Sequence, residues 1–266
     1  MARIRLDQLL TERGLARSRA EAQALVLAGA VELDGTRRLK PGQLVTTDAT
    51  VHLAERARWA SRAGAKLEHA LDAFAIDPAG LATLDAGAST GGFTDVLLSR
   101  GARVVYAVDV GRGQLIQRLR QDPRVVSMER TNLRELRALP EQVALATLDL
   151  SFISLRLVLP AVAELVTDGG EVVALVKPQF EAGREDVPRG GVVRDPTIHA
   201  RVLSEVAAAA AEAGFGATEV DRSPITGTDG NVEFLLHLRR GGSPPPELAT
   251  RIERVTAASP DSSVST

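Results

Sequence analysis

Two lysines and two carboxylates form the set of residues in this chain that is best suited to chemistry. They are Lys66, Asp149, Lys177 and Glu233. Lysine can lose its proton when its surroundings lower its pKa, whereas arginine in practice cannot. The chain has three lysines among 32 basic residues, and two of the three belong to this set. Such a set could deprotonate and orient a weakly acidic hydroxyl, for example that of a sugar. The alternative is a structural network of ion pairs.

A glycine-rich segment, Leu84-Asp-Ala-Gly-Ala-Ser-Thr-Gly-Gly-Phe93, lies where the first strand of a predicted sheet turns into a helix. Two of three candidate chemistries fit it poorly. Its glycines do not make the G-x-G-x-x-G spacing of a dinucleotide site. Gly87-Ala-Ser89-Thr-Gly91 does satisfy the G-x-S-x-G pattern of a nucleophile elbow, with His199 and His237 downstream, but no oxyanion-hole motif precedes it.

The third chemistry is an S-adenosylmethionine loop, in which glycines let the backbone approach the methionine part of the cofactor. A carboxylate at the end of the next strand then binds the ribose, by the same logic as in dinucleotide folds. Asp109 ends that strand, 22 residues after Gly87, and Asp85 is the acidic residue that such loops often carry. The sequence therefore favours a methyl-donor site over the other two.

The elements that must position these residues alternate between strand and helix from about residue 62. Short β-rich runs occur at 81–85, 103–109, 124–129, 143–149 and 171–177, and a final pair at 218–221 and 231–238 includes an antiparallel last strand. This alternation predicts an α/β fold, a Rossmann-like, mostly parallel, seven-stranded sheet with helices on both faces. Ligands of such sheets bind at the carboxyl ends of the strands, where Asp149 and Lys177 lie.

The N-terminal part of the chain differs from the rest in charge. Residues 1–64 hold 11 Lys/Arg against 7 Asp/Glu, a net charge of +4, which leaves −6 for the remainder. Two helices are predicted at 6–14 and 18–29, followed by strands at 31–35 and 43–45. Four arginines lie near the helix starts: Arg3, Arg5, Arg17 and Arg19. A basic α+β module of this kind is typical of polyanion binding, and it resembles the S4 RNA-binding domain.

Several further motifs occur in a fixed order along the chain. They are Ser-Arg-Ala-Gly-Ala-Lys-Leu, Leu-Asp-Ala-Gly-Ala-Ser-Thr-Gly-Gly-Phe-Thr-Asp, Leu-Asp-Leu-Ser-Phe-Ile-Ser-Leu, Leu-Val-Lys-Pro-Gln-Phe-Glu and Gly-Asn-Val-Glu-Phe. Together they resemble the TlyA (hemolysin A) family of ribosomal-RNA cytidine 2′-O-methyltransferases, which join an S4 domain to an FtsJ-like methyltransferase domain. The resemblance runs over residues 3–239. Ala63 and Ala65 depart from residues common in the family, and neither bears on the chemistry.

The resemblance implies a role for each motif. Lys66, Asp149, Lys177 and Glu233 would form a catalytic tetrad that acts on a ribose 2′-hydroxyl of ribosomal RNA, with no metal. S-adenosylmethionine would be bound by Asp85, Gly87, Ala88, Ser89, Thr90, Gly91, Gly92, Phe93 and Asp109. The S4 domain would contact RNA through Arg3, Arg5, Arg17 and Arg19.

Composition and length predict the organisation of the chain. With 266 residues, 44% of them hydrophobic, it can form an S4-like domain (1–54), a linker (55–61), a methyltransferase domain (62–240) and a mobile tail (241–266). Zero cysteines exclude disulfides and thiol catalysis. No apolar run reaches the length of a membrane span, and no signal peptide is visible, so a cytoplasmic protein is expected. No stable protein partner is implied, and a monomer is expected.

Two local features and two other functions stay open at this point. Trp59 either packs between domains or stacks on an RNA base. Residues 180–194 form a mobile lid, an RNA contact or a plain surface loop. Lys40 falls in a predicted turn and is given no chemistry. The fold could instead serve a non-catalytic ribosome assembly factor. The name hemolysin suggests a membrane-lytic protein, for which the sequence offers no strongly basic amphipathic helix.

Overall fold

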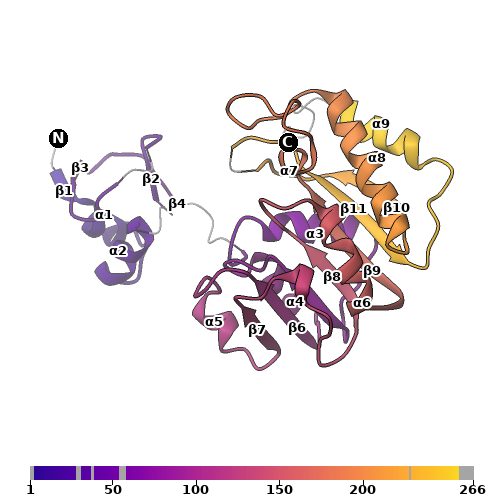
Figure 1. Cartoon of the computed structure of the whole chain (residues 1–266). Coiled ribbons are helices and arrows are strands. Elements are labelled where there is room, and N and C mark those ends of the chain that lie inside the picture. The colour runs from indigo at the N-terminus through magenta and orange to yellow at the C-terminus, as the bar shows by residue number, and fades with distance from the viewer. Residues whose placement is uncertain (1–2, 28–30, 37–38, 54–57, 228, 258–266) are drawn as a thin grey trace. The chain divides into compact units, whose positions relative to one another are not determined.

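The chain divides into two compact units, one on each side of the Arg58–Trp59 bond. The structure is a computed structural model, and it describes residues 3–27, 31–36, 39–53, 58–227 and 229–257 (Figure 1). Residues 54–57, which include the start of the predicted linker, lie outside the described residues, as do residues 28–30, which include the end of the second predicted helix, and the last nine residues.

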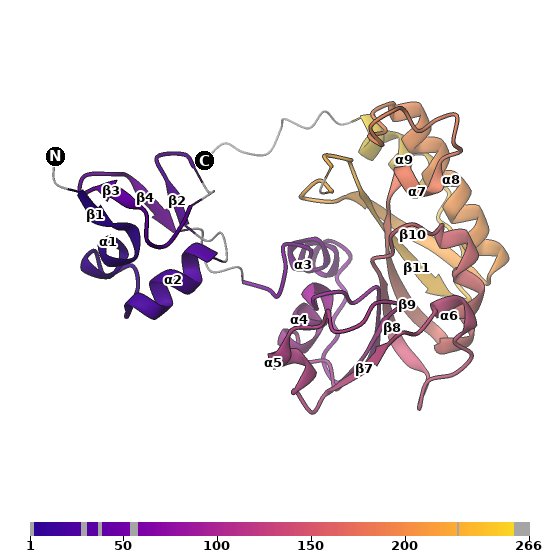
Figure 2. The ribbon, with the colours of Figure 1, turned by 60° about the vertical axis from the view of Figure 1, so that its left-hand side comes forward.

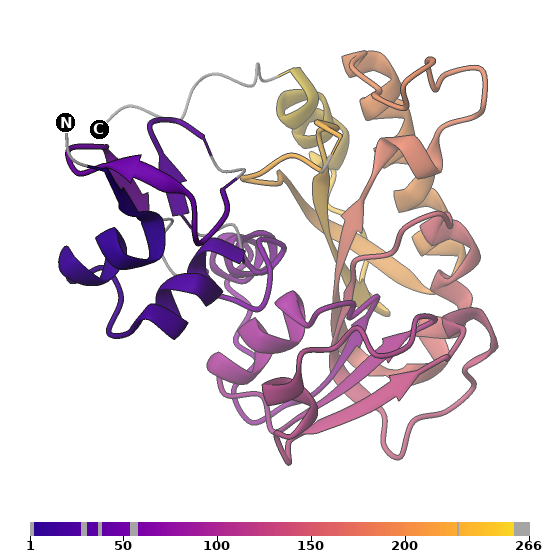
Figure 3. The same cartoon turned by 90° about the vertical axis from the view of Figure 1, so that its left-hand side faces the viewer.

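The first unit is a small α+β module in which two helices pack against short antiparallel strand pairs (Figure 3). Strand β1 pairs with β3, and β2 with β4. Its elements are β1 (Arg3–Arg5), α1 (Leu6–Glu12), α2 (Arg19–Leu27), β2 (Val31–Leu33), β3 (Leu44–Thr46) and β4 (Val51–Leu53). The buried Leu6, Leu9 and Leu10 recur at helical spacing and form the centre of its core. The two predicted helices and the strand regions are thus present.

The second unit contains a seven-stranded sheet in the order β10-β11-β9-β8-β5-β6-β7. Its strands are β5 (Ala82–Ala86), β6 (Val104–Asp109), β7 (Val125–Glu129), β8 (Val143–Leu148), β9 (Val166–Val176), β10 (Phe215–Arg222) and β11 (Phe234–Arg240). Strands β5 to β9 are parallel, while β11 is antiparallel to both β9 and β10. This is the predicted mostly parallel Rossmann-like sheet, with the antiparallel last strand.

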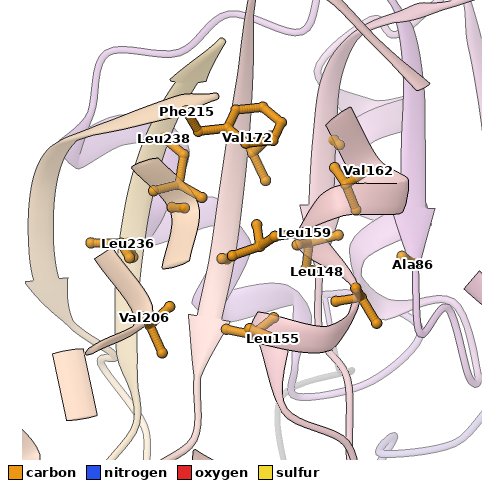
Figure 4. Close-up of a cluster of buried hydrophobic side chains, with 14 of the residues drawn as sticks. Ala86, Leu148, Leu155, Leu159, Val162, Val172, Val206, Phe215, Leu236 and Leu238 are labelled. Carbon is orange, nitrogen blue, oxygen red and sulfur yellow. The ribbon is translucent and has the colours of Figure 1, made fainter. Parts of the chain in front are cut away.

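Helices cover both faces of this sheet (Figure 2). On one side lie α3 (Gly64–Ala73), α4 (Gly92–Ser99) and α5 (Gln117–Arg120), and on the other α6 (Leu159–Leu165), α8 (Pro196–Glu212) and α9 (Leu248–Ala257). The sequence of β9 shows why. Val172, Ala174 and Val176 belong to one hydrophobic core, and the alternating Val173 and Leu175 belong to the other. Both faces of the strand are therefore apolar, as a doubly covered sheet requires. Figure 4 shows part of the first core, between the sheet and α6 and α8.

The C-terminal region differs from the mobile tail predicted from residue 241. After the proline-rich segment the chain forms α9, which contacts β10 and α8. Ile252 is 3% exposed and joins the main core, with Val255 packed beside it. The Gly, Ser and Pro residues before α9 suggested disorder, but the apolar spacing of Ile252 and Val255 within the helix provides the buried face that orders it.

Candidate active site

The four residues of the predicted tetrad line one cavity of about 510 Å3. They form two ion pairs. Lys177 Nζ lies 2.6 Å from Asp149 Oδ1, and Lys66 Nζ is paired with Glu233 Oε2. Lys177 Nζ also donates a hydrogen bond to Ser151 Oγ at 3.0 Å. All four side chains are at most 16% exposed. Each lysine thus faces the cavity while a carboxylate holds it from one side.

The topology of the sheet explains why these residues meet. Asp149 and Lys177 directly follow the neighbouring parallel strands β8 and β9. Glu233 was expected within the last strand, but it directly precedes β11. Because β11 runs antiparallel to β9, with Phe234 opposite Val176, its beginning lies at the same edge as the end of β9. Helix α3 brings Lys66 to this edge in its first turn.

A second cavity of about 480 Å3 adjoins the first. Five residues line both of them: Gly87, Ser89, Asp149, Ser151 and Phe152. The second cavity also contains Asp109, the last residue of β6, and the segment Thr131–Leu133, which follows the end of β7. One cavity therefore holds the charged tetrad, the other extends along the neighbouring strand ends, and Asp149 lies in the wall between them.

The glycine-rich loop joins the two cavities, and its backbone conformation requires glycine at two positions. Gly87 has a φ of +86°, and a Cβ there would lie 2.3 Å from the carbonyl oxygen of Asp149. Gly91, with a φ of +101°, precedes the first residue of α4, and a Cβ there would overlap Leu119 and Leu115. L side chains rarely adopt such φ values. The loop can therefore approach the strand ends closely, as binding a cofactor through its backbone demands.

Asp109 organises the loop from the end of β6. Its Oδ2 accepts a hydrogen bond from the backbone N–H of Ser89 at 2.8 Å, and its Oδ1 accepts one from Gly111 at 2.7 Å. Ser89 itself has a φ of +46°, an uncommon value for a residue with a side chain. The carboxylate of Asp109 thus fixes the loop at the mouth of the second cavity.

Not every predicted cofactor residue lines a cavity. Gly87, Ala88, Ser89, Thr90, Gly92, Phe93 and Asp109 do. Gly91 lines neither cavity and lies against Leu115 and Leu119. Asp85 is fully buried, and its Oδ2 accepts a hydrogen bond from Thr94 Oγ1 at 2.6 Å. Burial raises the pKa of Asp85 to about 7. Asp85 therefore connects β5 to the first turn of α4 from behind the loop.

Several lining residues were not predicted from the sequence. Asn132 lies in the second cavity and accepts a hydrogen bond from the backbone N–H of Arg134. Its place after the end of the third parallel strand was the available signal. Phe152 lines both cavities, is 91% exposed, and has a φ of +63°. Its ring lies 5.1 Å from that of Phe180. An exposed aromatic ring on a rare backbone conformation gives the cavities an apolar rim.

Glu181 ties the loop after Asp149 to the short helix α7 (Pro178–Glu181) that follows Lys177. Its carboxylate accepts hydrogen bonds from Ser154 Oγ at 2.6 Å and from the backbone N–H of Leu155 at 2.7 Å. Burial raises the pKa of Glu181. The two loops that carry the Asp149 and Lys177 pair are thus fixed to each other.

The nucleophile-elbow alternative finds no histidine beside Ser89. His199 is buried in α8 with Nε2 3.0 Å from the carbonyl oxygen of Val193. His237 lies within β11, between Thr218 and Glu171. Neither histidine lines either cavity. The arrangement therefore does not support a serine hydrolase.

Trp59 packs inside the second unit. Its Nε1 donates to Glu68 Oε2 at 3.3 Å, and the absence of a side chain at Gly64 makes room for its ring. The backbone N–H of Ala60 donates to Asp95 at 2.8 Å. Residues 59–61, predicted as the end of a linker, are thus part of the second unit.

The predicted 180–194 loop is held at its end by a buried side chain. Asn231 accepts a hydrogen bond from the Val193 N–H at 3.0 Å.

Of the predicted RNA-binding arginines, the structure brings two together. Arg5 and Arg19 both reach the carboxylate of Asp7. Arg17 is 85% exposed and lies 4.0 Å from Glu21, and Arg3 is exposed on β1.

Two other features are absent from the described ranges of the chain. There, no three His, Asp or Glu side chains are grouped closely enough to hold a metal ion. Nor does any described helix have the length and apolarity needed to cross a membrane.

Comparison with known proteins agrees with the geometry. The FtsJ-like methyltransferase model matches residues 59–240, and the S4 domain model matches residues 4–51. The 16S/23S rRNA (cytidine-2′-O)-methyltransferase TlyA of Mycobacterium tuberculosis is 52% identical over 241 residues, covering 89% of this chain and 90% of that protein. Hemolysin A of Brachyspira hyodysenteriae is 38% identical over 237 residues, covering 88% and 99%.

A solved structure described provisionally as a hemolysin, from Streptococcus thermophilus, has the same fold. It superposes with a TM-score of 0.76 at 47% sequence identity and covers 97% of this chain and 95% of its own. The chain therefore belongs to the TlyA (hemolysin A) family, whose members join an S4 domain to an FtsJ-like, S-adenosylmethionine-dependent methyltransferase domain.

Proposed function

We propose that the protein methylates the ribose 2′-hydroxyl of cytidine in ribosomal RNA, with 23S and 16S rRNA as candidate substrates. The observation that carries this proposal is the pairing of Lys177 with Asp149 and of Lys66 with Glu233 in one cavity beside the glycine-rich loop. A relative that is 52% identical is named for this reaction. We further propose that the protein acts in the cytoplasm. We also propose that it is a monomer, which a molar mass from light scattering would test.

The residues around the second cavity fit S-adenosylmethionine, which supplies the electrophilic methyl group when bound. The absence of a side chain at Gly87 lets the glycine-rich loop lie directly against Asp149 at the end of β8, so that its backbone lines the cavity. Asp109 lies at the end of β6, where a carboxylate can bind ribose hydroxyls. Asn132 and Thr131 offer hydrogen-bonding groups farther along the same cavity. The cofactor would thus lie across the ends of β5, β6 and β7.

The tetrad would prepare the hydroxyl for attack. Once Lys177 has released its own proton to solvent, its neutral Nζ can take the hydroxyl proton, and Asp149 at 2.6 Å stabilises the ammonium that forms again. Glu233 holds Lys66 at the other side of the cavity. There the positive charge of Lys66 can attract the developing alkoxide. Phe152 and Phe180 present an aromatic surface on which the target base can stack after it leaves its helix. Catalysis would depend mainly on positioning and electrostatics.

Mapping of ribose methylation tests the proposal directly. Ribosomal RNA from a strain without the gene should lack at least one 2′-O-methylcytidine that is present in the parent strain. The wild-type gene should restore the modification, and a gene encoding Lys177→Ala should not. Identical maps from the two strains would contradict the function. Binding of labelled S-adenosylmethionine with no transfer to any ribosomal RNA would instead indicate a non-catalytic assembly factor.

A further inference from the structure

A buried carboxylate lies beneath two arginines at the surface of the first unit. Asp7, in the first turn of α1, is fully buried, while the side chains of Arg5 and Arg19 are 44% and 56% exposed. Arg5 donates to both carboxylate oxygens, from Nε to Oδ1 at 3.1 Å and from Nη2 to Oδ2 at 2.9 Å. Arg19 Nη2 lies 3.4 Å from Oδ2, and Gln23 Nε2 donates to the same oxygen at 2.9 Å. One carboxylate therefore holds both guanidinium groups.

The geometry leaves the arginines able to bind a second anion. A guanidinium group presents its N–H donors along more than one edge. Arg5 uses the edge formed by Nε and Nη2 on Asp7, and with 44% of its side chain exposed it can still offer N–H donors to a ligand. Hydrogen bonding from Arg5 holds the pKa of Asp7 far below its usual range, so the carboxylate stays charged. Planar donors in this fixed orientation suit the oxygens of a phosphate group.

The turn that contains Pro41 and Gly42 also limits where the Arg5 guanidinium group can lie. A Cβ on Gly42 would lie 2.8 Å from Nη2 and 2.9 Å from Nη1 of Arg5, so glycine there leaves room for the guanidinium group. The backbone N–H of Asp7 donates to the carbonyl oxygen of Pro41 at 2.9 Å, which fixes this turn to α1. The turn, strand β1 and helix α1 thus converge on the orientation of Arg5.

We propose that Asp7 is a positioning residue that fixes Arg5 and Arg19 as one rigid pair for binding RNA phosphates. The inference rests on the proposed function, because it assumes that the chain acts on ribosomal RNA. A carboxylate among these cations lowers the positive charge of the surface, which by electrostatics alone weakens RNA binding. The compensating gain is that two long side chains lose less conformational freedom when the phosphate binds.

Removing one negative charge from helix α1 should strengthen RNA binding by electrostatics alone, but should weaken it if the carboxylate that is lost positions the arginines. Asp7→Asn and Glu12→Gln each raise the charge of helix α1 by one unit, and Glu12 is exposed. Affinity for ribosomal subunits from a strain without the gene is measured over a range of salt concentrations with full-length protein. We expect Asp7→Asn to bind about five- to tenfold more weakly than wild type, with a salt slope smaller by about one. Glu12→Gln should bind equally or more tightly. Equal or tighter binding by a folded Asp7→Asn protein overturns the positioning role.

A second variant covers the case in which Asp7→Asn does not fold. Gly42→Ala changes no charge and leaves Asp7 in place, yet it should displace the Arg5 guanidinium group and weaken binding by a similar factor. Unchanged binding by Gly42→Ala would then refute the inference. Wild-type protein that binds the subunits without transferring methyl groups overturns the proposed function alone. An active wild-type protein whose Asp7→Asn variant binds as tightly as Glu12→Gln overturns the positioning role alone.

Discussion

At the scale of single residues, the proposed mechanism gives different roles to Lys66 and Lys177, in a chain whose only other lysine is Lys40. Lys177→Arg keeps a positive charge beside Asp149 but cannot accept a proton at neutral pH. We expect methyl transfer to fall at least about 100-fold, the usual size of a general-base contribution. Binding of S-adenosylmethionine, measured by calorimetry, should change little.

Lys40→Arg is the matched control for this experiment, because Lys40 lines neither cavity. Its transfer rate should equal that of the wild type. A Lys177→Arg protein with wild-type turnover would exclude Lys177 as the proton acceptor and leave it an electrostatic role.

The pair of Lys66 and Glu233 should matter for stability as well as for activity. Both side chains are at most 7% exposed, so removing one partner leaves the other charge buried and unpaired. We expect Glu233→Ala to lower the free energy of unfolding by about 3–5 kcal/mol. The double variant Lys66→Met with Glu233→Leu should recover much of that loss while staying inactive. Urea denaturation measures both, and a single variant as stable as wild type would show that the pair is well solvated.

At the scale of elements, the close approach of the glycine-rich loop to the end of β8 gives a prediction. Gly87→Ala introduces both an unfavourable φ and a Cβ 2.3 Å from the Asp149 carbonyl oxygen. Gly80→Ala introduces only the first, because Gly80 has a φ of +73° and no atom near its Cβ position. We expect Gly80→Ala to cost about 1–2 kcal/mol of stability with activity unchanged. Gly87→Ala should in addition lose cofactor binding and methyl transfer. Equal behaviour of the two proteins would contradict a role for close approach.

Helix α9 gives a second prediction at this scale. Ile252 is buried against the main core, so Ile252→Ala should lower the free energy of unfolding by about 2–4 kcal/mol. The exposed Thr250→Ala on the same helix should change it by less than about 0.5 kcal/mol. Chemical denaturation compares the two proteins. A neutral Ile252→Ala would mean that α9 is dispensable for the second unit.

At the scale of the whole molecule, the two units should respond to pH in opposite senses through their buried aspartates. In the second unit, burial raises the pKa of Asp85 from 3.8 to about 7. The folded state then keeps a proton that the unfolded state has lost. The contribution of Asp85 to stability is therefore complete below pH 3.8 and is lost as pH rises through about 7. Arg5 lowers the pKa of Asp7 in the first unit, so its contribution exists above pH 3.8 and is lost on further acidification.

The variant Asp85→Asn isolates the first of these effects, because its side chain is neutral at every pH. Relative to wild type, its free energy of unfolding should rise between pH 5 and pH 8. Urea denaturation at several pH values measures the difference. A difference that does not depend on pH would show that Asp85 has an ordinary pKa.

Much of this architecture follows from the sequence because parallel strands end at one edge of a sheet. That rule placed Asp149 and Lys177 together without any knowledge of distances. The pairing of Lys66 with Glu233 could not be predicted, since it depends on the register of an antiparallel strand 167 residues away. Asp85 alternates with its neighbours on a strand that is buried on both faces, so the sequence could not show which way it points. Helix α9 was missed because local composition outweighed a short apolar pattern.

The reversal of β11 also has a consequence for the order in which the protein is made. Glu233 reaches the carboxyl edge of the sheet only because its strand runs backwards beside β9, and it supplies the partner of Lys66. A ribosome synthesises Lys66 long before Glu233, and domains generally fold as units from the N-terminus onward. During translation the arginine-bearing first unit can therefore fold and meet RNA while the tetrad is still incomplete. Catalysis begins only after nearly the whole chain has emerged.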